Sequence, residues 1–72
     1  MARFDAPRLL NRVREYRKIL NMSQYELAAA SGVERVTIAR LDAYPAAMPS
    51  LPTALRLAKA FGIPVQELVE KA

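Results

Sequence analysis

A single glycine inside a run of helix-forming residues constrains the fold of this chain more than any other feature. Gly32 lies in the middle of the segment SQYELAAASGVERVTIARLD, which covers residues 23–42. Glycine inside a helix costs about 1 kcal/mol relative to alanine, yet it adopts the left-handed conformation that ends a helix at little cost. The segment is therefore predicted to form two short helices at a steep angle instead of one long helix.

Local signals of the same kind predict five helices and no strand. Asp5, Ser23 and Ser50 can cap the first, second and fourth helices, Glu26 completes a capping box with Ser23, and Gly62 ends the fourth helix. No alternating run of Val, Ile and Thr is long enough for a strand, so the fold is predicted to be all-α. The helices are expected at about residues 7–20, 23–31, 34–43, 51–61 and 65–71.

Apolar residues spaced by three and four positions give these helices one inward face each, and hence one small core. The residues expected to face it are Leu9, Val13, Tyr16, Leu20, Leu27, Ala28, Val33, Ile38, Leu41, Leu51, Leu55, Leu57, Ala58, Phe61 and Leu68. The expected organisation is a compact bundle, in which residues 1–7 form an N-terminal arm and residues 8–72 form a single domain.

The excess of positive charge is confined to the beginning of the chain. Residues 1–20 hold six basic and two acidic residues, a net charge of +4, whereas residues 21–72 hold five of each. This asymmetry favours a polyanionic partner, with nucleic acid first and an acidic membrane surface second. A solvated helix with an arginine-rich exposed face explains the same count equally well.

The residue types that are missing argue against most catalytic and metal sites. The chain has no cysteine and no histidine, so it offers no thiolate ligand and no imidazole base to activate a serine nucleophile. It also lacks an apolar run of the roughly 20 residues that a membrane span needs. We therefore expect a cytoplasmic protein that is not an enzyme and needs no metal or cofactor.

The predicted helix at 34–43 presents side chains that are suited to reading DNA bases. Ile38 and Leu41 are expected to face the core, which turns the opposite face of this helix to solvent. Arginine donates two hydrogen bonds to guanine, and the methyl groups of threonine or valine contact that of thymine. Ordinary solubilising residues are the alternative explanation of this face. Its side chains are Arg35, Val36, Thr37 and Arg40.

Residues 23–42 resemble the helix-turn-helix of Cro and the phage repressors, which form the XRE family. The family pattern is S-Q-x-x-L-A-x-x-x-G-V-x-x-x-x-I-x-x-x-E. This chain shares Ser23, Gln24, Leu27, Ala28, Gly32, Val33 and Ile38 with it, and Asp42 replaces the glutamate. The resemblance extends over about residues 8–70, and it implies a lambda-repressor-like five-helix bundle whose partner is double-stranded DNA.

The resemblance also implies roles for individual residues. Its base-reading positions coincide with the four residues of the outward face. The positions that it implies for phosphate contact or support are Ser23, Gln24, Arg12, Arg14 and Glu34. For Arg12 and Arg14 a merely solvated role is the alternative. Arg17 and Asp42 match a pair that forms an internal salt bridge between the first and third helices.

Two departures from the family pattern bear on DNA contact. The loop at 44–49 is uncharged, whereas the family usually brings a lysine or arginine from this loop to a phosphate. The N-terminal arm or a partner is then expected to supply the missing charge. Glu34 lies where serine or threonine is common: it suits the helix dipole, it would repel a phosphate, and it can accept a hydrogen bond from cytosine. The sequence leaves these alternatives open.

Apolar residues near the end of the chain predict a homodimer. Val65, Leu68 and Val69 on the predicted last helix exceed what one small core needs, and similar family members commonly pair through their C-terminal helices. A two-fold dimer places two recognition helices about 34 Å apart and reads a near-palindromic site. Completion of the core is the alternative role for these residues.

The sequence supports two functions. The first is a small stand-alone transcriptional regulator of bacterial or phage type, similar to Cro-like repressors, restriction–modification controller proteins and antitoxins. The second is a protein-interaction module on the same fold, with a partner such as a toxin or a polymerase. The uncharged loop at 44–49 favours the second function.

Overall fold

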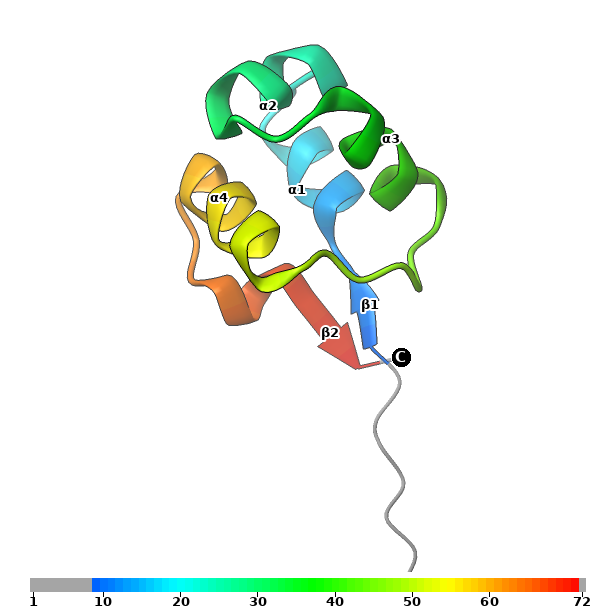
Figure 1. The fold of residues 1–72 in the computed structure, drawn as a ribbon. Coiled ribbons are helices and arrows are strands. Elements are labelled where there is room, and N and C mark those ends of the chain that lie inside the picture. Colours follow the sequence, from blue (N-terminus) through cyan, green and yellow to red (C-terminus); the bar gives the residue numbers. More distant parts are fainter. Residues whose placement is uncertain (1–8, 72) are drawn as a thin grey trace, which may run out of the picture.

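The chain folds mostly into short helices. The structure is a computed structural model that describes residues 9–71, so the expected arm at 1–7 and the Asp5 cap lie outside the described residues. The elements are β1 (Leu9–Asn11), α1 (Val13–Ile19), α2 (Gln24–Ser31), α3 (Arg35–Ala43), α4 (Leu51–Phe61), the 3₁₀ helix η1 (Val65–Leu68) and β2 (Val69–Lys71). Figure 1 shows α2 and α3 at one end of the molecule and the β1–β2 sheet at the opposite end.

The α2–turn–α3 segment has the structure that the sequence predicts. Ser23 Oγ accepts a hydrogen bond from the Glu26 N–H (3.0 Å), and Glu26 Oε1 accepts one from the Ser23 N–H (2.8 Å), which completes the capping box. Gly32 follows α2 with φ = 73°, and its N–H donates to the Ala28 carbonyl (2.9 Å). Because the left-handed glycine stops α2 and redirects the chain, two helices form in place of one rod.

Replacing Gly32 with alanine is expected to lower the free energy of unfolding by about 1–2 kcal/mol. A Cβ at this position meets no atom within 4 Å, so the cost comes from the left-handed backbone alone, which is about 1–2 kcal/mol for a residue with a Cβ. Gly62, with φ = 72° and equally open surroundings, makes Gly62→Ala a matched comparison with the same expected cost.

Gly32→Asn provides the second comparison, because asparagine tolerates the left-handed conformation and should therefore cost less than alanine. Urea denaturation followed by circular dichroism measures the free energy of unfolding of all three variants. An asparagine variant as unstable as the alanine variant would show that backbone conformation is not the cause.

α4 begins and ends where the sequence predicts, but two of its leucines face solvent. Ser50 Oγ accepts a hydrogen bond from the Thr53 N–H (3.4 Å) at the first turn. Leu51 is 66% exposed and Leu55 is 50% exposed, so their expected inward positions are wrong. The buried stripe of α4 is Ala54, Leu57, Ala58 and Phe61. Leu55 comes directly after Ala54 and therefore lies about 100° away from it around the helix. Leu51 lies in the first turn, before the buried stripe begins.

Both ends of the described chain differ from the prediction, and the fold is not all-α. Residues 9–11 and 69–71, which were predicted to be helical, pair as antiparallel strands with Leu10 opposite Glu70. The predicted fifth α-helix is replaced by η1 and β2. The Arg12 N–H donates to the Leu68 carbonyl (2.7 Å) just beyond the ladder. Each segment thus supplies the backbone partners of the other, and local spacing cannot reveal a partner so far away in the sequence.

Asn11 marks the change from strand to helix. Its side chain is buried, and its Oδ1 accepts a hydrogen bond from the Val13 N–H (3.1 Å), where α1 begins. The amide group donates to the carbonyls of Leu41 (3.1 Å) and Ala47 (2.7 Å). One buried asparagine therefore provides the acceptor for a backbone N–H in the first turn of α1. It also holds the segment that follows α3 against the start of α1.

One core connects the helices. The side chains at its centre are fully buried: Val13, Leu27, Ile38, Leu57 and Leu68. Leu9 (40% exposed) and Leu20 (45% exposed) were expected in this core, and they lie outside it because α1 spans only Val13–Ile19. Among residues 9–71, no helix combines the length and the apolarity that crossing a bilayer requires.

Leu68 belongs to the core and not to a dimer surface. Its side chain is 0% exposed, and the α-helix on which the predicted homodimer interface depended is absent from residues 65–71. Val65 packs against the core, and Val69 lies in β2. The predicted place of Leu68 in a homodimer interface is therefore wrong, because its side chain is inaccessible to a second copy. Val65 and Val69 are half-buried, and their part in such an interface stays a prediction.

Candidate nucleic-acid interface

α3 turns one face into the core and the opposite face to solvent. Ile38 is 0% exposed and Leu41 is 3% exposed. Val36 is 61% exposed, Arg40 is exposed one turn later, and Thr37 is half-buried beside them. Because residues four apart are neighbours on a helix surface, Val36 and Arg40 form one continuous surface, which we call the outward strip.

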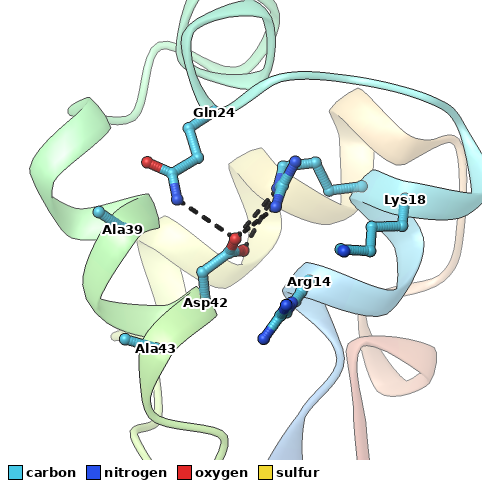
Figure 2. Close-up of a pocket in the computed structure, with 7 residues that line it drawn as sticks. Arg14, Lys18, Gln24, Ala39, Asp42 and Ala43 are labelled. Atoms are coloured by element: carbon cyan, nitrogen blue, oxygen red, sulfur yellow. Dashed lines mark hydrogen bonds and ion pairs between the residues drawn. The ribbon is translucent and has the colours of Figure 1, made fainter.

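Polar contacts join α1, α2 and α3 (Figure 2). Asp42 Oδ2 accepts hydrogen bonds from Arg17 Nη2 (2.6 Å), Arg17 Nε (3.2 Å) and Gln24 Nε2 (3.3 Å). Gln24 Oε1 in turn accepts one from Arg35 Nη1 (3.3 Å). Gln24 therefore connects the ion pair between α1 and α3 to a base-reading candidate at the start of α3.

The Arg17–Asp42 ion pair, which the resemblance implies, is present and mostly buried. The two side chains are 15% and 8% exposed, and Arg17 Nη1 also donates to the Met22 carbonyl (2.8 Å). In the part of the chain that the structure describes, no buried side-chain nitrogen or oxygen lacks a hydrogen-bond partner. The pair thus ties α1 to α3.

Tyr25 contacts Arg35, although the sequence did not predict a role for Tyr25. The Arg35 guanidinium carbon lies 5.0 Å from the centroid of the Tyr25 ring, and Tyr25 is itself 71% exposed. A cation over an aromatic face is attracted by the ring. Tyr25 and Gln24 together restrain the Arg35 side chain. The two contacts join α2 to α3, so spacing within either helix gives no signal for them.

A family model described as helix-turn-helix (HTH_3) matches residues 13–68, which is most of the chain. The chain belongs to this helix-turn-helix family. The match confirms the resemblance to the Cro and repressor type of domain. No curated protein matches the chain. Members of the family are DNA-binding regulators and are generally not enzymes, so in general terms this chain is a DNA-binding regulator.

Arg12 of the helix-turn-helix domain does not lie at the α2–α3 surface. It pairs with Glu15, lies 4.9 Å from the centroid of the Tyr16 ring, and donates a hydrogen bond to the Glu67 carbonyl (3.4 Å) in η1. The hydrogen bond to Glu15 raises the pKa of Arg12 above its ordinary value. The guanidinium is thus engaged near the sheet end of the domain, and the structure does not bring it to the other site residues.

The remaining polar candidates lie at the starts of the two helices of the helix-turn-helix. Ser23 is exposed at the start of α2, where its hydroxyl takes part in the capping box. Glu34 is exposed at the N-cap position of α3, and its side chain forms no capping hydrogen bond. At the other end of α3, the uncharged loop exposes Tyr44 (64%) and Met48 (41%).

Arg14 borders a hollow between α1 and α3 of the helix-turn-helix domain (Figure 2). The hollow has a volume of about 300 Å³. Its wall on α1 is Arg14, Arg17 and Lys18, and its wall on α3 is Ala39, Asp42 and Ala43. Lys18 follows Arg14 by one turn and was not among the predicted site residues. Its signal in the sequence is the i, i+4 spacing of the two cations.

Proposed function

We propose that this protein is a sequence-specific transcriptional regulator that reads the major groove with α3, as a dimer on a near-palindromic operator. The outward strip supports this proposal, because it exposes Val36 and Arg40 on a helix whose opposite face is packed against the core. The nine residues of α3 make a helix about 14 Å long, at a rise of 1.5 Å per residue. An α-helix with its side chains is about 10–12 Å in diameter, which fits the major groove, about 12 Å wide.

Each residue on this side of α3 is suited to one kind of base contact. Arg40 is exposed and can donate two hydrogen bonds to guanine O6 and N7, a contact that contributes about 1–3 kcal/mol of discrimination. Arg35 is held by Gln24 and Tyr25, which limits the conformations that it loses on binding. The methyl groups of Val36 and Thr37 suit the methyl group of thymine.

The small size of α3 supports action as a dimer. One short helix contacts only a few base pairs, and pairing two copies doubles the number that is read. Leu51 and Leu55 expose apolar side chains on α4 that a second copy would cover, and Leu68 would take no part. In a two-fold dimer the half-sites lie about 34 Å apart, one turn of the duplex. The protein would then act as a regulator of the kind found in Cro-like repressors, controller proteins and antitoxins.

One observation favours a second candidate function, a protein-interaction module. The loop at 44–50 carries no charge, and two of its large apolar side chains, Tyr44 and Met48, are exposed. A protein partner such as a toxin or a polymerase would bind such a surface more readily than a DNA phosphate would. This function does not require duplex binding, which separates it from the first.

Selection of bound sequences from a random duplex pool tests the proposed function. The expected result is an enriched site with two-fold symmetry and half-sites one helical turn apart. Affinity for that site should fall with salt, with a log–log slope of about −0.9 per neutralised phosphate. An enriched site without symmetry would contradict the dimer. No enrichment, together with duplex binding that is undetectable or insensitive to salt, would favour the protein-interaction module.

Removing the ring of Tyr25 is expected to reduce discrimination between bases by about two- to five-fold. Tyr25→Leu abolishes the cation–π contact with Arg35, which contributes about 0.5–1 kcal/mol at an exposed position. Tyr25→Phe keeps the aromatic face and should retain the discrimination of the wild type. Competition binding with the selected site and single-base variants measures the effect. Equal losses in the leucine and phenylalanine variants would show that the hydroxyl group matters and not the ring.

A further inference from the structure

The hollow between α1 and α3 holds positive charge that the domain itself does not neutralise. Figure 2 shows Arg14 and Lys18 extending from α1 toward the space beside α3. Among the described residues, neither side chain forms an ion pair. The one carboxylate that lines the hollow, on Asp42, is already paired with Arg17 and hydrogen-bonded to Gln24. Two cations therefore face an open space without a counter-charge.

Small residues keep this space open. Ala39 and Ala43 line the hollow from α3, and neither has a side chain long enough to reach the cations opposite. A larger or acidic residue at either position would fill the hollow or pair with Arg14 or Lys18. The alanines leave room for an anionic group that comes from outside the domain.

The hollow also adjoins the outward strip. Ala39 follows Val36 by three residues, and Ala43 follows Arg40 by three, so each alanine is a surface neighbour of a strip residue. When a helix lies in the major groove, the phosphates of the groove walls pass along its sides. A duplex bound to the outward strip would therefore bring backbone phosphates next to the hollow.

We infer that this hollow is a phosphate seat, in which Arg14 and Lys18 bind a backbone phosphodiester of the strand that borders α3. This inference rests on the proposed function. It adds which side of the domain would hold the DNA backbone. The loop at 44–50, which follows α3, is uncharged and offers no cation of its own. The cations on α1 thus bind the DNA backbone. A phosphate contact of this kind contributes affinity and fixes the position of the protein on the duplex, but it does not read the base sequence.

Neutralising both cations tests the inference. The double variant Arg14→Gln with Lys18→Gln keeps two good helix formers, so it is expected to fold. Its matched control is Arg56→Gln with Lys59→Gln on α4, which removes the same charge from exposed positions outside the hollow. For the duplex selected from the random pool, the hollow variant should show a salt slope smaller by about 1–2, which corresponds to one or two lost phosphate contacts. The slope of the control should stay at the wild-type value, and the base preferences of both variants should be unchanged.

Neutral methylphosphonate linkages, introduced one position at a time into the selected duplex, provide the second measurement. The wild type should lose affinity at one or two linkages beside the half-site, and the hollow variant should lose nothing further at those linkages. Equal salt slopes in the hollow variant and the control, or methylphosphonate losses that persist in the hollow variant, would overturn the phosphate seat and leave the proposed function intact. A wild type that does not bind any duplex would overturn both.

Discussion

Asp42→Ala is expected to lower the free energy of unfolding by about 3–5 kcal/mol, because it leaves a guanidinium buried without its anionic partner. Arg17 is only 15% exposed, and both its Nε and its Nη2 donate hydrogen bonds to the Asp42 carboxylate. Gln24 loses an acceptor in the same variant. The contact that holds α3 against α1 would therefore be lost.

This loss is large for a chain of 72 residues. A domain of this size has a total stability of about 4–11 kcal/mol, at 0.05–0.15 kcal/mol per residue. For domains of 60–100 residues, each kcal/mol shifts the melting temperature by about 4–8 °C. The variant should thus melt at least about 12 °C below the wild type, and thermal and urea denaturation followed by circular dichroism would measure the change.

Two comparisons make the Asp42 prediction specific to a buried charge. Glu15→Ala removes the other ion pair of the described chain, whose carboxylate side chain is 44% exposed, and should have a far smaller effect because exposed ion pairs contribute little. The double variant Arg17→Met with Asp42→Leu removes both charges and should recover much of the lost stability. A double variant no more stable than Asp42→Ala would show that the stranded charge is not the cause.

Arg40→Ala is expected to weaken binding to the selected site by about 5- to 150-fold and to change binding to random duplex far less. The range corresponds to the 1–3 kcal/mol that a bidentate arginine–guanine contact contributes. Arg40 is exposed in the last turn of α3, on the outward strip and away from the network that restrains Arg35. Its guanidinium is therefore free to enter the groove.

The ratio of the two affinities decides the role of Arg40. Competition binding at constant salt gives the loss on each duplex, and Arg56→Ala on α4 is the control that removes one charge elsewhere. Equal losses on both duplexes, with a salt slope smaller by about 0.9, would mean that Arg40 contacts only a phosphate. Losses confined to the selected site, with relaxed preference at one base pair, would identify the base that it reads.

The parts of the fold that depend on neighbouring residues were predictable from the sequence. The Ser23–Glu26 capping box and Gly32 bound α2 where they were expected to, since each signal acts within one turn of the backbone. Burial of Ile38 and Leu41 followed from their spacing along α3. The spacing on α4 was less decisive. Ala58 and Phe61 fit both the predicted stripe with Leu55 and the observed stripe with Ala54, and only packing against the core decides between the two.

The candidate site was predictable only in part. The outward strip follows from the same periodicity that buries the opposite face of α3. The Arg17–Asp42 pair was implied by the family resemblance alone. Spacing could not predict it, because the two residues lie 25 positions apart on different helices. The engagement of Arg12 with Glu15 and Glu67, the contact of Tyr25 with Arg35, and the hollow beside Lys18 all depend on how helices pack. Spacing within one helix carries no information about them.

The sequence by itself determined the break between α2 and α3, because the conformational preference of Gly32 is a property of one residue and needs no partner. Only the tertiary structure decided that residues 9–11 and 69–71 form strands, that Leu68 is buried, and that a hollow lies beside Arg14. Residues 9–11 and 69–71 become strands because each satisfies the backbone hydrogen bonds of the other, and that pairing exists only once the core has brought them together.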